Sequence, residues 1–189
     1  MISDSSGTAD RIVFGVAAGA AGERATAVLR EVFATALAGD TPLIVTDYAT
    51  AELVKVAANA FLATKISFIN AMAEIAEVAG ADVTQLADAI GHDARIGRQF
   101  LNAGLGFGGG CLPKDIRAFM ARAGELGVDQ ALTFLREVDS INMRRRVRMV
   151  DLAGAHLLGR WRRGDGDAAA ETVVQAYLDA TARDNPADL

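Results

Sequence analysis

The stretch GFGGGCLPKD at residues 106–115 holds the residue types that point most directly to chemistry. Its Cys111 is the one cysteine among 189 residues, and it stands between a run of glycines and Pro113, a residue suited to the first turn of a helix. A cysteine attacks as its thiolate, which a helix N-terminus and a nearby cation such as Lys114 both favour. A lone cysteine is also a common small core residue. The local sequence therefore leaves Cys111 as either a nucleophile or a buried filler.

A second polar set lies upstream, at Glu52, Lys55 and Asn59. Their spacing of i, i+3 and i+7 places them on one face of a helix that is otherwise apolar. A lysine there could polarise an oxygen, and an asparagine could hold a water or an oxyanion. The alternative is an ordinary Glu52–Lys55 ion pair on a solvated face.

Two segments rich in arginine could bind anions. HDARIGRQF, at residues 92–100, carries Arg95 and Arg98 beside Asp93, so an arginine there either binds a phosphate or closes the loop against an acid. RRRVR, at residues 144–148, has no interleaved aromatic residue, and we interpret it as a solvated helix end.

Other polar positions carry less information. The set Lys65, Asn70 and Glu74 is interpreted as ordinary surface or interface polarity. His92 and His156 are the only histidines, and no group of cysteines and histidines has the spacing of metal ligands, so we predict no metal site.

Composition bounds the class of protein. A net charge of −5 and a pI near 5.0 argue against a nucleic-acid binder. A single cysteine cannot form an internal disulfide, which fits a reducing cytoplasm. The N-terminus carries acids and no basic region of the kind that starts a signal peptide, and the apolar run at residues 12–22 is too short to span a bilayer. We expect a cytoplasmic protein with no membrane or nucleic-acid partner.

Hydrophobic periodicity predicts a mainly α fold. Residues 1–10 are expected to be a flexible start. The strand–helix–strand segment that follows is typical of part of an α/β layer. One long helix comes next, and because it is apolar on more than one face, we expect it to be buried or shared with a second subunit. Shorter helices complete the pattern. The predicted elements are strands at 11–16 and 41–47 and helices at 23–37, 49–79, 81–91, 113–127, 129–158 and 168–182.

Four motifs together resemble the UDP-glucose/GDP-mannose 6-dehydrogenase family, and its bacterial UDP-glucose members most of all. AELVKVAANAFLATKISFIN is similar to the central helix of that family; DARIG, GLGFGGGCLPKD and SINMRRR follow in the family's order. The resemblance covers roughly residues 10–153.

The resemblance implies a reaction and a set of catalytic residues. Members oxidise the C6 hydroxyl of UDP-glucose twice, to UDP-glucuronate, with two NAD; an enzyme cysteine forms a thiohemiacetal and then a thioester, which water hydrolyses. Cys111 would be that nucleophile. Lys55 would stabilise oxyanions, Asn59 would help to hold them or the water, and Asp115 would assist water and proton transfer.

Further site residues follow from the same resemblance. Members bind the nucleotide sugar through a loop and the glycine motif, and an arginine reaches the substrate of the partner subunit. Arg95 would be that arginine, and Lys114 would contact substrate and cofactor. The expected substrate-binding set is Phe100, Leu101, Asn102, Arg95, Gly108 and Lys114.

The resemblance also implies a domain organisation. Residues 1–48 would be the remnant of a Rossmann-like NAD-binding domain, residues 49–158 the helical catalytic and dimerisation domain, and residues 159–189 an atypical tail in place of a UDP-binding domain. The long helix would form a homodimer. No G-x-G-x-x-G follows a strand, so we expect a chain that is inactive alone. The alternative is a non-catalytic dimerising module.

Overall fold

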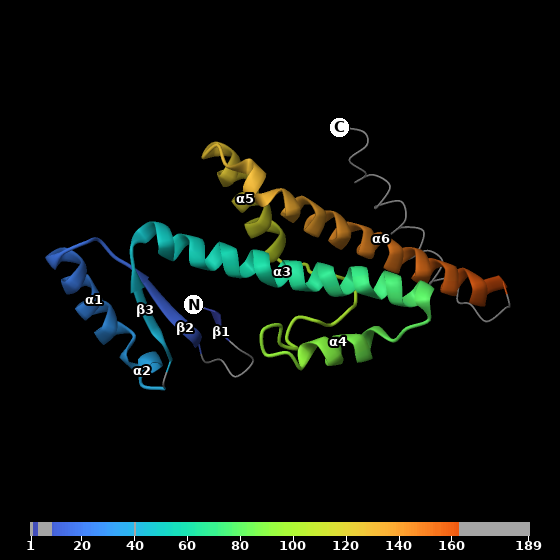
Figure 1. Cartoon of the computed structure of the whole chain (residues 1–189), viewed down its shortest axis with the longest axis horizontal. Helices are drawn as coiled ribbons and strands as arrows, with labels where there is room; N and C mark the ends of the chain where they lie inside the picture. Colours follow the sequence, from blue (N-terminus) through green and yellow to red (C-terminus); the bar gives the residue numbers. More distant parts are fainter. Residues whose placement is uncertain (1, 4–8, 40, 163–189) are drawn as a thin grey trace. The chain divides into compact units, whose positions relative to one another are not determined.

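The computed structural model describes residues 2–3, 9–39 and 41–162 (Figure 1). The predicted helix at 168–182 and most of the predicted tail lie outside these residues. The described chain is mainly α-helical, with one long helix after a short strand–helix–strand segment, so the predicted fold class is confirmed. In chain order the elements are β1 Ile2–Ser3, β2 Ala9–Gly15, α1 Ala20–Val32, α2 Ala34–Leu37, β3 Leu43–Thr46, α3 Tyr48–Ala79, α4 Val83–Gly91, α5 Leu112–Glu125, a 3-10 helix Asp129–Leu132 and α6 Thr133–Arg162.

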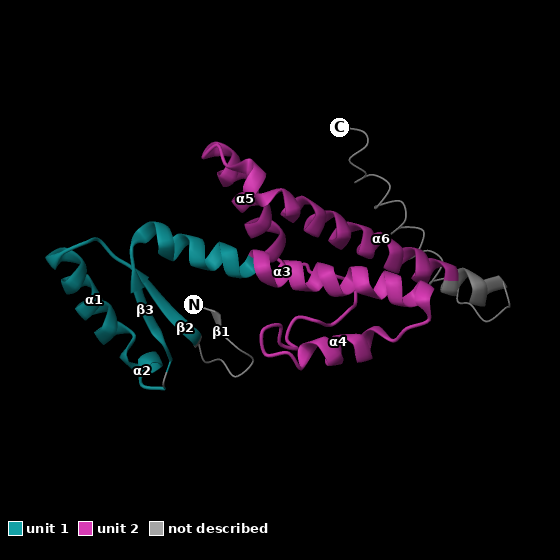
Figure 2. Cartoon of the chain, viewed as in Figure 1, with its two compact units in different colours: residues 1–59 teal, residues 60–189 magenta. Residues whose placement is uncertain are grey.

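The chain divides into two compact units, Met1–Asn59 and Ala60–Leu189 (Figure 2). The division falls inside α3, which runs without interruption through residue 59. The domain boundaries expected from the sequence, after residues 48 and 158, stay predictions.

The first unit is built on a small sheet. β2 pairs in parallel with β3, from Ile12 opposite Leu43 to Gly15 opposite Thr46, and β1 pairs antiparallel with the start of β2. The prediction of a flexible start at residues 1–10 is therefore wrong for Ile2–Ser3, which the sheet edge takes up as a strand.

One face of this sheet packs on helical residues that follow β2. Ile12 and Phe14 are buried, and the rings of Phe14 and Phe33 lie 5.7 Å apart. Phe33 separates α1 from α2, so the single helix predicted at 23–37 is two helices. The aromatic side chain that anchors the sheet stands at the break between them.

The second unit holds two hydrophobic clusters. One is formed by residues of α3, α5 and α6 together with the loop residue Phe107; the other joins α3, α4 and Leu101. The two clusters fix both ends of the long loop between α4 and α5. Their buried members are Ala60, Ala63, Phe107, Ile116, Leu135 and Val138 in the first, and Ile69, Ala87 and Leu101 in the second.

Local sequence explains where the helices of this unit begin. Asp82 caps α4 by accepting hydrogen bonds from the backbone N–H groups of Thr84 and Gln85. Pro113 stands in the first turn of α5, as predicted. The long helix predicted at 49–79 is observed as Tyr48–Ala79.

By length and composition alone, α3 would also qualify as a membrane span. The core helix of a globular protein passes the same test, and α3 contributes Ala63 and Ile69, which are fully buried, to the two clusters. We therefore describe α3 as a core helix.

Candidate functional site

Cys111 stands at the N-terminal end of α5 and is exposed to solvent. Its carbonyl oxygen accepts the first bond of the helix, from the Asp115 N–H at 2.9 Å. Gly109, with φ at +77°, and Gly110 precede it and are exposed, so no bulky side chain screens the thiol from that side. Of the two interpretations the sequence left open, the buried filler is excluded.

Lys114 and Asp115 follow the cysteine on the first turn of α5. The Lys114 ammonium lies 3.4 Å from Asp115 Oδ1, and the lysine side chain is largely exposed whereas the carboxylate is buried. Asp115 also takes part in a further polar interaction. An exposed thiol therefore stands in sequence beside an exposed cation and a buried carboxylate. These groups are suited to nucleophilic attack and proton transfer.

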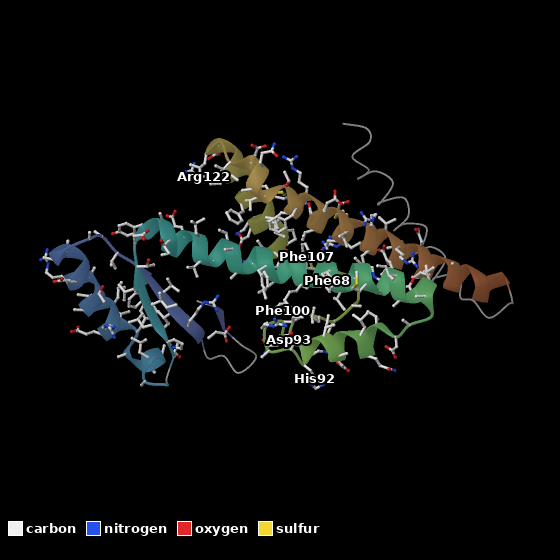
Figure 3. All side chains as sticks on the ribbon, viewed as in Figure 1. Phe68, His92, Asp93, Phe100, Phe107 and Arg122 are labelled. Carbon is white, nitrogen blue, oxygen red and sulfur yellow. The ribbon has the colours of Figure 1, made fainter. Side chains whose placement is uncertain are left out.

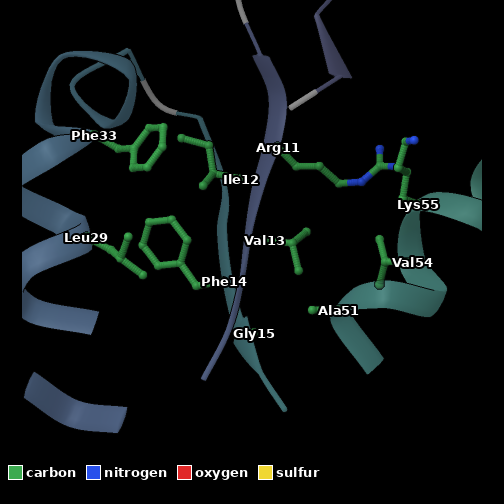
Figure 4. Close-up of a pocket in the computed structure, with 10 residues that line it drawn as sticks. All are labelled: Arg11, Ile12, Val13, Phe14, Gly15, Leu29, Phe33, Ala51, Val54 and Lys55. Atoms are coloured by element: carbon green, nitrogen blue, oxygen red, sulfur yellow. The ribbon is translucent and has the colours of Figure 1, made fainter. Parts of the chain in front are cut away.

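Lys55 and Asn59 belong to the first unit, one helical turn apart on α3. Lys55 is exposed and Asn59 half-buried, and each takes part in a polar interaction. Lys55 also lines a cavity of about 410 Å³, whose wall is made mostly of apolar residues of β2, α1 and α3 (Figure 4). Arg11 is the other charged residue of the lining.

The loop after α4 contains two arginines with different partners. Arg95 is almost fully exposed and forms a bidentate pair with Asp93, with Nη2 to Oδ2 at 2.6 Å. The hydrogen bond from the Arg95 side chain, followed by that from its backbone N–H, lowers the pKa of Asp93. Arg98 instead donates to Asp88 and to the Leu101 carbonyl. Of the two roles left open for this segment, Arg98 closes the loop against an acid.

The residues expected to hold the nucleotide sugar come next on this loop (Figure 3). Phe100 adopts a left-handed backbone with φ at +65°, an uncommon conformation for a residue other than glycine, and its side chain is exposed. Leu101 is buried in the second cluster, and the side chain of Asn102 accepts a hydrogen bond from Arg98 at 2.8 Å. Only the backbone of Leu101 remains suited to ligand binding, because its side chain serves the core.

Four residues that sequence reasoning did not assign to the site hold the next part of the loop. Their contacts join the loop backbone at Gly104 and Phe107 to α3 and α6. The four residues are Asn70, Asn142, Arg145 and Arg146.

The interpretation of residues 144–148 as a solvated helix end is wrong for Arg145, which is 7% exposed and donates to the Gly104 carbonyl. It is also wrong for Arg146, which is half-buried and donates to the Phe107 carbonyl. A signal was present in the sequence: Asn142 and Arg145 follow Leu135 and Val138 at helical spacing, on the buried face of α6. Polar groups on such a face need buried partners.

The turn after β2 differs from a dinucleotide-binding turn. A strand, a glycine turn and a helix follow one another at β2, Gly19 and α1, but the glycines at 15, 19 and 22 lack the G-x-G-x-x-G spacing. The space beside Gly22 is filled by the chain itself, because an added Cβ would lie 1.8 Å from the Ala17 carbonyl oxygen. The described residues therefore contain no dinucleotide-binding glycine turn. Within the same residues, no group of three or more His, Cys, Asp or Glu side chains could hold a metal ion.

Comparisons with known proteins give the family. The central-domain profile of the UDP-glucose/GDP-mannose dehydrogenase family matches residues 49–144. The UDP-glucose 6-dehydrogenase of Rickettsia felis is 42% identical over 165 residues, 87% of this chain and 34% of the relative. That of Pseudomonas aeruginosa is 40% identical over 152 residues, 80% of this chain and 32% of the relative.

A solved structure of a UDP-glucose dehydrogenase from Pyrobaculum islandicum is similar, with a TM-score of 0.64 and 38% identity over 83% of this chain and 33% of that one. The chain thus spans about a third of the length of these relatives. The matched region contains the long helix, the glycine-rich loop and Cys111. The chain belongs to the UDP-glucose/GDP-mannose dehydrogenase family, of which it contains the central domain.

Proposed function

We propose that this chain carries the nucleophile of a nucleotide-sugar dehydrogenase that oxidises UDP-glucose to UDP-glucuronate. The observation that carries the proposal is the placement of Cys111: the one cysteine of the chain is exposed at the start of α5, four residues before a buried carboxylate. The names of the relatives, all UDP-glucose 6-dehydrogenases, support UDP-glucose as the substrate.

In this proposal the Cys111 sulfur attacks C6 of the UDP-glucose aldehyde. The S–C6 bond forms, the C6–O6 π bond breaks, and the thiol proton passes through the Asp115 carboxylate to O6, which gives a thiohemiacetal. Lys55 and Asn59 stabilise the oxyanion. Hydride loss from C6 of this adduct would give a thioester, and Asp115 activates the water whose oxygen replaces the Cys111 sulfur at C6, which releases the uronate and the thiol.

The binding roles follow the loop between α4 and α5. The backbone of residues 100–102 and Gly108 holds the nucleotide sugar, Lys114 contacts substrate and cofactor, and Arg95 leaves Asp93 to reach the substrate of a partner subunit. NAD, when bound, supplies the hydride acceptor. Because the described residues contain no dinucleotide-binding glycine turn, the chain alone is inactive in this proposal, and turnover needs a dinucleotide site that these residues do not supply.

The chain forms a homodimer through α3 in the cytoplasm. Exposed apolar side chains recur on one face of this helix at the seven-residue spacing of a helix–helix seam, with Phe61, Phe68 and Ile75 in one series. Val78, three residues after Ile75, is 91% exposed and continues the stripe. Apolar stripes of this kind mark a surface that another protein covers.

The second candidate is a non-catalytic dimerising module. The same stripe favours it, together with the lack of a dinucleotide site among the described residues. The two candidates differ in one respect that can be measured, namely whether Cys111 reacts with the aldehyde.

The test uses the full chain and the 6-aldehyde of UDP-glucose. If Cys111 is the nucleophile, the aldehyde slows alkylation of the thiol by iodoacetamide, whereas UDP, which has no aldehyde, protects less. Removal of the aldehyde by gel filtration restores the rate, because a thiohemiacetal is reversible. Equal protection by both compounds would favour the non-catalytic module. Steady NADH production by the chain with UDP-glucose and NAD would contradict the claim that it is inactive alone.

A further inference from the structure

Among the loop residues before Cys111 that are bonded to side chains of the helices, the nearest to the cysteine is Phe107. Its amide N–H donates to Asn142 Oδ1 at 2.7 Å, and Asn142 Nδ2 donates back to its carbonyl oxygen at 3.0 Å. Arg146 Nη2 donates to the same oxygen at 2.6 Å. Both backbone polar groups of Phe107 are therefore bonded to side chains of α6.

The contact is buried and leaves little freedom. Asn142 is 2% exposed, and the Phe107 side chain is 3% exposed in the first hydrophobic cluster. The preceding residue must be a glycine, because Gly106 has φ at +91° and a Cβ there would lie 2.3 Å from Asn142 Oδ1. A Cβ at Gly108 would lie 2.9 Å from Arg146 Nη2. The glycines on either side of Phe107 thus let α6 approach the backbone.

A second point of attachment lies three residues upstream. The Gly104 N–H donates to Asn70 Oδ1 at 2.9 Å, and its carbonyl accepts from Arg145 Nε at 2.9 Å. Arg145 is paired in turn with Glu77 of α3. The segment from Gly104 to Phe107 is therefore fixed by residues of α3 and α6 at both ends.

Beyond Phe107 the chain makes no such contacts until α5 begins. Gly108, Gly109 and Gly110 are exposed, and Cys111 follows as the N-cap residue of α5, whose Ile116 is buried in the same cluster as Phe107. Three glycines between two anchors have wide conformational freedom. The range open to the backbone of Cys111 is therefore limited on one side by α5 and on the other, across three glycines, by the bonded Phe107.

The geometry points to Asn142 as a positioning residue for Cys111: its amide, supported by Arg146, holds the backbone of Phe107 and so sets where the thiol is presented. This inference rests on the proposed function, in which Cys111 is the nucleophile. A catalytic thiol needs a fixed approach to its substrate, because small misplacements of reacting groups cost rate. Asn142 supplies that constraint through the backbone without contact with the substrate.

The experiment follows the mobility of Cys111 without substrate or cofactor. Because Cys111 is the one cysteine of the chain, a nitroxide label attached to it reports on this position alone. In Asn142→Ala, we expect a more mobile label and roughly tenfold faster hydrogen exchange at the Phe107 amide, since a buried hydrogen bond is lost. The matched control is Ser67→Ala, which removes another buried bond to α6, from Ser67 Oγ to the Val138 carbonyl at 2.7 Å. That control should leave the label unchanged.

A milder pair keeps the test decisive if Asn142→Ala does not fold. Arg146→Met removes one bond to Phe107 and keeps an aliphatic side chain, whereas Arg144→Met changes an exposed arginine that donates a hydrogen bond to Ser140 on its own helix. The label should gain mobility in the first variant and not in the second. An unchanged label in Asn142→Ala or Arg146→Met, or an equal change in variant and control, would overturn the inference.

This readout is independent of the chemistry of the aldehyde. If Asn142→Ala frees the label but the aldehyde never protects Cys111 of the unmodified chain, the positioning role stands and the proposed reaction fails. If the aldehyde protects Cys111 and the label does not respond to Asn142→Ala, the proposed reaction stands and the positioning role of Asn142 fails.

Discussion

The two units of the chain differ in how far their own residues bury their apolar surface. The second unit, from Ala60 onward, contains both hydrophobic clusters, with Ile69, Ile116 and Leu135 fully buried. Among the described residues of the first unit, the buried apolar side chains are Ile12 and Phe14, and a cavity of about 410 Å³ opens beside them. A unit that closes its own core can hold a site in place, whereas a two-layer fragment with an open core needs more surface to pack against.

The two units also differ in how their exposed apolar residues are arranged. In the second unit they include one ordered stripe on α3, with Phe61, Phe68 and Ile75 at seven-residue spacing. In the first unit they are spread over helix and sheet, for example Val32 on α1 and Ile44 on β3. The first pattern fits one helical partner, and the second fits packing against further layers of an α/β domain.

The largest expected effect compares the two cores directly. Leu135→Ala should lower the free energy of unfolding by about 3 kcal/mol, because it leaves a cavity in a closed cluster. Ile12→Ala should cost less, about 2 kcal/mol, because Ile12 already borders a cavity. Urea unfolding measures the loss in the free energy of unfolding of the whole chain. Hydrogen exchange of β2 and of α6 shows in which unit that loss occurs. Equal losses of free energy of unfolding in the two variants would show that the two cores do not differ as described.

The next effect tests the ordered stripe. Replacing Phe61 and Phe68 by glutamate should weaken self-association roughly 30-fold or more, since charges would enter the centre of an apolar interface. The control replaces Val28 and Val32 by glutamate; both are exposed on α1 of the first unit, and the change should leave self-association unchanged. Sedimentation equilibrium measures both. A strictly monomeric unmodified chain would contradict the homodimer.

The smallest effect concerns the acidic residues at two helix starts, one in each unit. Hydrogen bonds from the backbone N–H groups of Gln85 and Thr84 lower the pKa of Asp82, and those from the backbone and side chain of Thr50 lower the pKa of Asp47. A lowered folded-state pKa means that the stabilisation is present above the unfolded value of 3.8 and is lost as pH falls through the folded value.

Asp82→Asn and Asp47→Asn should therefore each flatten the fall in melting temperature between about pH 5 and pH 2. The asparagine keeps an acceptor for the cap but does not titrate. Thermal scans between about pH 5 and pH 2 measure how steeply the melting temperature falls with pH. Because caps are local, the two units should respond alike, and a response in one unit alone would show that the helix starts also depend on tertiary packing.

Sequence patterns predicted the elements where local signals were strong. The long helix at 49–79, the start of α5 at Pro113 and the strand–helix–strand order follow from periodicity, proline and β-branched runs. The break at Phe33 was missed because no glycine or proline marks it, and β1 was missed because two residues carry no period. β1 is a strand only because it pairs with β2, and a local pattern does not show that pairing.

For the candidate site, too, local sequence predicted some features and missed others. The sequence by itself determined which residues could do chemistry, because residue type and spacing fix a cysteine, a lysine and an aspartate at the start of α5. Only the tertiary structure decided that Cys111 is exposed, that Arg98 closes its loop, and that Asn142 and Arg145 face inward to hold Gly104 and Phe107. The physical reason is that burial and hydrogen-bond partners come from segments tens of residues apart, and a local pattern carries no record of which segments will meet.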